Sequence, residues 1–189
     1  IGHPQLELEA NKALGALYMN MQDLGNATTH LSRAQFISYQ QRDTLNQAEA
    51  TMHMAGVCSF QKKYAKSEAI YRQAEMLLEA TGLSESKYKQ SLGMVYHQHA
   101  GSFVQQGLLD SAQQTESKAV ELLAQAGNNA ERAMSLASLA AIQSKQNRHD
   151  DAIASLTRCL STCSALDDES APIVATGLSQ LALEYTAAG

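Results

Sequence analysis

The stretch HMAGVCSFQKKYAKSEAIYRQA, residues 53–74, allows two interpretations of this chain. Its lysines and tyrosines could form a basic patch with interleaved aromatics, which would favour nucleic-acid binding. They could also form the turn and second helix of a helical hairpin. Three other segments share its spacing of small residues, and this periodicity favours the second interpretation. Those segments are residues 12–34, 98–119 and 138–159.

Three columns of small residues run through the aligned segments. The first column is Gly15, Ala55, Ala100 and Ala140, and it recurs at Ala182. The second is Ala27, Ser67, Ala112 and Ala152, and the third is Ala34, Ala74, Ala119 and Cys159. Small side chains let helices approach to about 8–10 Å. Each segment is therefore predicted to be an antiparallel helix pair, repeated at steps of 40, 45, 40 and 42 residues.

Composition supports an all-α chain and argues against several partners. Two prolines and a predominance of helix-forming residues over 189 residues leave little support for a sheet. The net charge of −5 argues against a nucleic-acid surface, and no apolar run is long enough for a membrane helix. With three cysteines and no visible secretory signal, we expect a cytoplasmic location.

The repeat resembles the tetratricopeptide repeat (TPR), whose signature is a Leu-Gly/Ala pair, an aromatic three residues later, and an Ala, an aromatic and an Ala in the second helix. The segment KKYAKSEAIYRQAEMLLEATG, residues 62–82, is especially similar to the long repeats of kinesin light chains. In these longer repeats Gly82 and Gly127 would serve as left-handed helix stops in place of proline.

The resemblance implies an α-α superhelix, a TPR solenoid of about four and a half helix-turn-helix repeats in one domain, 1–189. We expect repeats at approximately 5–43, 44–83, 84–128 and 129–168, with a final helix at 169–189. First helices are predicted near 5–21, 44–61, 86–106, 129–146 and 171–187. Second helices are predicted near 25–41, 65–81, 109–126 and 149–166.

The resemblance also implies that the first helices line a concave groove that binds a peptide or a partner helix. The predicted groove residues are Lys12, Ala16, Asn20, Met52, His53, Gly56, Phe60, Met94, His97, Gly101, Gln105, Ser138, Ala141, Lys145 and Gln180. Small residues lie at the centre of this face, and few of the residues around them are charged. Peptide binding is therefore expected to depend only weakly on salt.

Some proteins with such repeats clamp a peptide's terminal carboxylate with Lys, Asn and Arg on successive first helices. Lys12 matches one clamp position, but Ala16 replaces the Asn, so a carboxylate clamp is not favoured. Two alternatives to the peptide-binding scaffold remain. The chain could be the regulatory, ligand- or peptide-sensing part of a larger protein, or a structural module that forms homo-oligomers through the ends of the array.

Nothing in the sequence favours an enzyme, a metal site or a cofactor. There is no phosphate-binding loop, nucleophile elbow or metalloprotease motif. His97 and His99 would point about 200° apart on a helix, so they cannot share a metal ion. Cys159 and Cys163 share a helix face, but Cys159 belongs to the third small column, so core packing is the preferred interpretation.

Overall fold

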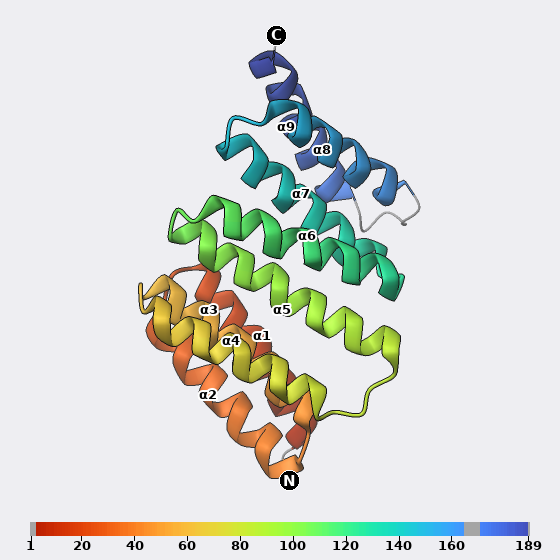
Figure 1. Ribbon diagram of the computed structural model, residues 1–189. Helices are drawn as coiled ribbons and strands as arrows, with labels where there is room; N and C mark the ends of the chain where they lie inside the picture. The colour runs from red at the N-terminus through yellow and green to blue at the C-terminus, as the bar shows by residue number, and fades with distance from the viewer. Residues whose placement is uncertain (1–2, 165–170, 189) are drawn as a thin grey trace. The chain divides into compact units, whose positions relative to one another are not determined.

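The computed structural model describes residues 3–164 and 171–188, which form nine α-helices and no strand (Figure 1). The all-α prediction is thus confirmed for this part of the chain. The first helices of the pairs are α1 (Pro4–Asn20), α3 (Thr44–Phe60), α5 (Glu85–Gln105), α7 (Asn129–Lys145) and the unpaired α9 (Ala171–Ala188). The second helices are α2 (Leu24–Gln41), α4 (Tyr64–Glu79), α6 (Leu109–Ala126) and α8 (His149–Cys163).

The chain divides into two compact units, Ile1–Ser84 and Glu85–Gly189. In the first unit α1 packs on α2, α2 on α3 and α3 on α4. In the second, each helix from α5 to α9 packs on the next one along the chain. Within each unit the first helices also contact one another, α1 with α3, α5 with α7 and α7 with α9. Each unit is therefore a stack of helix pairs, the arrangement that the repeat predicted.

The columns of small residues lie where the helices approach most closely. In the four complete pairs, the residues of the second and third columns are wholly buried. The hydroxyl of Ser67 donates a hydrogen bond to the carbonyl of Ala55, at 2.8 Å, and so joins the first two columns directly. A Cβ at Gly15 would lie 2.6 Å from the Leu31 side chain, which leaves no room for a larger residue. Close packing thus accounts for the small residues.

The turn inside each helix pair repeats the same backbone geometry. Its final left-handed residue is Gln22, Lys62, Gly107 or Asn147, with φ of 59°, 59°, 75° and 59°. The amide of the following residue bonds to the carbonyl five residues earlier, over 2.9–3.0 Å in all four turns. This pattern is the Schellman helix stop, and it ends each first helix without a proline.

The two glycines predicted as helix stops behave differently. Gly127 is the left-handed C-cap of α6, with φ of 75°, so that prediction is confirmed. Gly82 also has a positive φ, of 64°, but α4 has already ended at Glu79 with a right-handed cap at Ala80. The prediction that Gly82 stops α4 is therefore wrong, because the last turn of that helix closes two residues earlier.

The lysines and tyrosines of residues 53–74 separate as the hairpin interpretation predicts. Tyr71 is 1% exposed and its pKa is raised, mainly by burial. Lys62, Lys63 and Lys66 are exposed around the turn between α3 and α4. The aromatic ring of Tyr71 is therefore not available to stack on a nucleic-acid base. Among the described residues, no helix is both long and apolar enough to cross a membrane.

Candidate functional site

In the first unit, the predicted groove residues of α1 and α3 divide into buried and accessible positions. Lys12, Ala16 and His53 are half-buried, whereas Asn20 and Phe60 are exposed. Met52, with 5% of its surface exposed, and Gly56 are buried in the packing of α3. Since a buried residue offers no surface to a partner, we leave Met52 and Gly56 out of the candidate surface.

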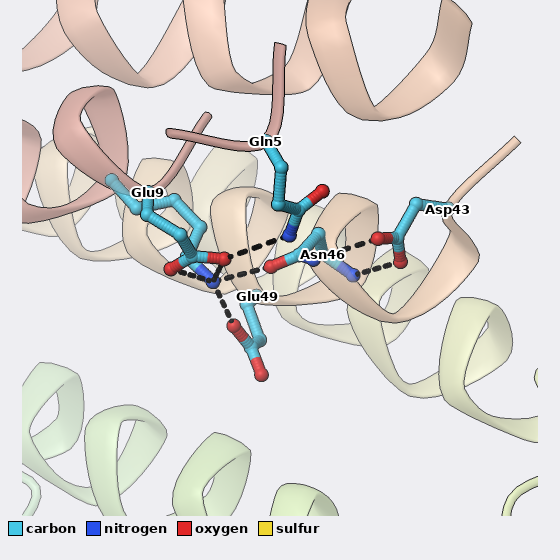
Figure 2. Close-up of polar contacts among 6 residues, drawn as sticks. Gln5, Glu9, Asp43, Asn46 and Glu49 are labelled. Carbon is cyan, nitrogen blue, oxygen red and sulfur yellow. Dashed lines mark hydrogen bonds and ion pairs between the residues drawn. The ribbon is translucent and has the colours of Figure 1, made fainter. Parts of the chain in front are cut away.

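Lys12 is the centre of a polar network that joins α1 to the start of α3 (Figure 2). Its ammonium donates to Asn46 Oδ1 and to Glu49 Oε2, the latter at 2.6 Å, and lies 3.2 Å from Glu9 Oε2. Asp43 caps α3 and holds Asn46 in place. The backbone N–H and the side-chain N–H of Asn46 donate to the Asp43 carboxylate at 3.0 and 2.7 Å. The residue that caps the helix therefore also positions a hydrogen-bond acceptor of Lys12.

The charges in this network determine the state of two residues. Burial disfavours the ammonium of Lys12, but the hydrogen bond and the charge of Glu49, with those of Glu9, outweigh it and raise the pKa of Lys12. Burial, and next the charge of Lys12, lowers the pKa of His53 to about 4. At neutral pH the lysine is therefore charged and the histidine is neutral.

This arrangement bears on the carboxylate clamp. A clamp lysine must offer N–H donors to an incoming carboxylate, whereas the Lys12 ammonium already bonds three side-chain oxygens. Two of these three partners, Glu9 and Glu49, are carboxylates. An anionic ligand would have to displace them and would then meet their repulsion. In this structure Lys12 serves to connect two first helices.

In the second unit, Met94 and His97 of α5 and Ser138 and Ala141 of α7 are half-buried, as is Gln180 of α9. The remaining predicted positions, Gly101, Gln105 and Lys145, are exposed. A Cβ added at Gly101 would meet no heavy atom within 4 Å, so this position is open. In contrast to Gly56, Gly101 therefore lies on an accessible surface.

His97 joins α5 to its two neighbours in the second unit. Its Nδ1 lies 2.7 Å from Glu116 Oε1 on α6 and 3.3 Å from Ser135 Oγ on α7. Glu116 is 1% exposed and Ser135 wholly buried. Serine, histidine and glutamate together suggest a hydrolase triad, but both contacts use the same ring nitrogen. In a triad the acid and the serine bond to opposite nitrogens, so this cluster cannot activate the serine in that way.

The histidines and cysteines of the sequence analysis do not form a metal site. His99 stacks on Phe103, with ring centroids 4.6 Å apart, while His97 bonds to Glu116. Cys159 donates to the carbonyl of Ala133 at 3.2 Å inside the core, and burial, with Cys163, raises its pKa to about 11. Within the described ranges, no group of His, Cys, Asp or Glu side chains could hold a metal ion.

A pocket of about 280 Å³ lies between α7 and α9 over a residue of α8, inside the second unit. Three of the predicted residues line it: Ala141, Lys145 and Gln180. Leu156 forms an apolar part of its lining, and the amide oxygen of Gln180 is buried with no hydrogen-bond partner within the described part of the chain. The pocket thus combines apolar surface with an amide and an ammonium group.

Glu184 fixes the position of α9 against the other helices at this pocket. Its Oε2 lies 2.7 Å from His149 Nδ1 on α8. Hydrogen bonds from Ser144 of α7 and from His149 lower the pKa of Glu184, with the Ser144 contribution larger. The carboxylate is therefore ionised at neutral pH and is directed inward, toward two helices of the same unit.

Several residues of these contacts were not predicted as site residues, among them Asn46, Glu49, Glu116 and Glu184. Their partners are between 19 and 37 residues away, beyond the range of helical periodicity. One signal was available. Glu116 occupies a position where the repeat expects an aromatic residue, and a charged residue in a packing column requires a partner.

Comparisons with known proteins agree with the fold of packed helix pairs. Neither a scan against protein-family models nor a search of curated proteins gave a match. Solved structures do match. The nearly identical TPR-like repeats of a Podosopora anserina protein, described as a kinesin light chain, match with a TM-score of 0.69 and 16% identity, covering 100% of this chain and 90% of that one. A variant of those repeats with one substitution gives the same TM-score and identity, with coverages of 100% and 89%.

A third match is BtubC (BKLC) from P. vanneervenii, with a TM-score of 0.58, 16% identity and coverages of 98% of this chain and 67% of that one. At this identity the matches show the fold. The chain has a TPR-like α-solenoid fold of the type found in kinesin light chain-like repeats, as the sequence predicted.

Proposed function

We propose that this chain is a protein-interaction module that binds an extended peptide or a partner helix on the first-helix face of its second unit. The observation that carries the proposal is the pocket between α7 and α9. The resemblance to tetratricopeptide repeats assigned Ala141, Lys145 and Gln180 to one binding face, and all three line this pocket. Residues chosen for one reason therefore gather around a concavity that can hold a ligand.

The chemistry of the pocket indicates what it would hold. Its volume of about 280 Å³ suits one or two side chains, and Leu156 and Leu183 supply apolar contact. The Lys145 ammonium supplies a cationic donor, and the half-buried Gln180 side chain lines the same pocket with its amide oxygen buried. We therefore expect a segment with an apolar side chain in the pocket and a carbonyl or carboxylate near Lys145.

Selection from a random peptide library tests the proposal, with Ala141→Arg and Ala154→Arg as a matched pair. Arginine at position 141 fills the pocket, whereas Ala154 is exposed on α8 and lies outside it. Peptides selected on the wild type should bind Ala141→Arg at least about tenfold more weakly, a loss of about 1.4 kcal/mol, and Ala154→Arg normally. Equal binding to both variants would contradict the proposal.

Salt dependence gives a second measure of the same interaction. Lys145 is the one exposed charge among the pocket residues, because Glu184 is bonded inward. A contact with a single exposed charge is screened only modestly. The Kd of selected peptides should therefore change by less than about threefold between low and physiological salt. A steep loss of affinity would point to a different, charged surface.

A further inference from the structure

The imidazole of His97 has one nitrogen in the core of the second unit and the other at the accessible edge of the ring. Within the described part of the chain, both polar contacts of the ring use Nδ1, which lies 2.7 Å from Glu116 Oε1 and 3.3 Å from Ser135 Oγ. Both partners are buried. The His97 side chain nevertheless keeps 21% of its surface exposed, and Nε2 is not among the buried, unpartnered polar atoms of the described residues. The accessible edge is therefore the one that carries Nε2.

The carboxylate of Glu116 determines which nitrogen of His97 keeps its hydrogen. A carboxylate only accepts hydrogen bonds, so Nδ1 donates to it in both protonation states of the ring. The second proton is therefore bound at Nε2. In the charged ring Nε2 is an N–H donor, whereas in the neutral ring it is an acceptor. The nitrogen at the accessible edge thus changes its hydrogen-bonding character with pH.

Two acidic side chains from the helices packed on α5 act on this ring. Glu116 comes from α6 and Glu131 from α7, and Gln90 of α5 donates to Glu131 at 3.2 Å. Burial opposes a charge on His97, but the hydrogen bond and charge of Glu116, with the charge of Glu131, outweigh it and raise the pKa of His97. The two carboxylates also offset the positive charge of the ring. A neutral acceptor therefore suits this place better than a further carboxylate.

The surface beside His97 has room for a main chain. Met94 and Gly101 lie three residues before it and four after it, so they flank it on the same face of α5. A Cβ at Gly101 would meet no heavy atom within 4 Å, which lets an incoming backbone approach the helix. An extended segment has unpaired carbonyl groups, whereas a helix bonds all but those of its last turn internally. An extended peptide therefore supplies a carbonyl for Nε2 more readily than a partner helix.

We propose that His97 is a proton-dependent recognition residue, whose Nε2–H donates to a backbone carbonyl of an extended peptide that passes over Gly101. This inference rests on the proposed function, because it uses the first-helix face of the second unit, and it narrows the ligand to an extended segment. When the ring loses its proton, Nε2 and the carbonyl are both acceptors, and the hydrogen bond is lost. The chain therefore binds its peptide more tightly at acidic than at alkaline pH.

Peptides selected from a random library on the wild type at about pH 6 are the probe. Their Kd should rise about threefold to tenfold between about pH 6 and pH 9, because a charge-assisted hydrogen bond gives way to two facing acceptors. His97→Gln should give a Kd that is constant over this range, since the glutamine amide does not titrate. His3→Gln, at an exposed position of the first unit, should keep the wild-type dependence.

Glu116→Gln separates recognition by His97 from a purely structural role. Glutamine can still accept a hydrogen bond from Nδ1, but it lacks the charge that favours the charged ring, so the pKa of His97 should fall. The pH at which the Kd changes should fall with it. If His97 and Glu116 only held the helices together, the substitution would weaken binding equally at every pH. Circular dichroism at both ends of the pH range checks that each variant remains helical.

NMR of the imidazole gives a direct measurement in the wild type. In the free chain, the neutral ring of His97 should carry its hydrogen on Nδ1. Saturation with a selected peptide should raise the pKa of His97, because the peptide binds the charged ring more tightly. A peptide that donates an N–H group to Nε2 would lower that pKa instead. A neutral ring protonated at Nε2, or a pKa that falls or stays the same on binding, would overturn the proposal.

The pocket variant Ala141→Arg distinguishes this proposal from the proposed function. Peptides that Ala141→Arg weakens, but whose Kd does not change with pH, would support the pocket and overturn the role of His97. Peptides with a pH-dependent Kd that His97→Gln makes constant and Ala141→Arg leaves unchanged would support His97 and contradict the pocket. A pH dependence that persists in His97→Gln would also overturn the role of His97.

Discussion

Nδ1 of His97 on α5 lies 2.7 Å from the buried carboxylate of Glu116 on α6. Burial opposes a charge on the ring, but the hydrogen bond and charge of Glu116, with the charge of Glu131, outweigh it and raise the pKa of His97. His97 thus connects α5 to α6 in the second unit, and its Nδ1 also lies 3.3 Å from Ser135 Oγ of α7.

A raised pKa in the folded state gives a definite pH dependence. The stabilisation is fully present below the unfolded pKa of about 6.5 and is lost as pH rises through the folded value. We expect His97→Gln to lower the free energy of unfolding by about 1–3 kcal/mol at about pH 6 and by less at about pH 8. Urea unfolding at both pH values measures this, and an equal loss at both would contradict it.

His53 in the first unit should respond to pH in the opposite sense. Its pKa of about 4, set by burial and then by the charge of Lys12, lies below the unfolded value, so the folded state binds fewer protons. Stability should therefore fall as pH drops from about 6.5 toward 4. In urea titrations, the free energy of unfolding of His53→Gln should fall less over that pH interval than that of the wild type.

Lys12→Met provides an independent check on this histidine. It removes the second cause of the shift and leaves the burial, so the pKa of His53 should rise while staying below about 6.5. Titration of the imidazole by NMR measures the pKa directly. An unchanged pKa would mean that the ring does not sense the lysine.

Two glycines on first helices should respond oppositely to the same substitution. At Gly15 a Cβ would lie 2.6 Å from Cγ and Cδ2 of Leu31, which is wholly buried, so Gly15→Ala should cost about 1–3 kcal/mol. At Gly101 no atom lies within 4 Å, so Gly101→Ala should stabilise by about 0.5–1 kcal/mol. Thermal unfolding of the two variants gives both signs, and a stabilising Gly15→Ala would contradict the packing role of the small column.

The repeated helix stop predicts a second pair of opposite effects. Lys62 has φ of 59° at the turn position that Gly107 occupies in the third repeat. A left-handed conformation costs an L residue about 1–2 kcal/mol, so Lys62→Gly should stabilise and Gly107→Ala destabilise by about 1 kcal/mol each. Asn147→Gly should gain less, because asparagine tolerates this conformation. Urea midpoints of the three variants test the ranking.

Much of the fold could be predicted from the sequence because it depends on local and periodic features. Every described helix begins within one residue of its predicted start. The first small column needs only a size at a fixed place, and Gly15, Ala55, Ala100 and Ala140 are all buried. Size and periodicity are properties that a single sequence displays.

The candidate site was less predictable, because it depends on long side chains that meet across helices. The repeat places Lys12 on the correct face, but it does not indicate that Asn46 and Glu49 would engage the ammonium. The register likewise treats Gly56 and Gly101 as equivalent, whereas one is buried and the other open. Local differences in packing separate such positions, and periodicity does not encode them.

The small columns also explain how this fold can coexist with so little sequence identity. Three positions in each step of 40–45 residues must be small, and nearly all others need only suit a helix. A chain under such sparse constraints can replace most of its residues without changing how its helices meet. The 16% identity at a TM-score of 0.69 is what this freedom produces. The exposed surface of the helices can therefore change while the scaffold beneath it stays the same.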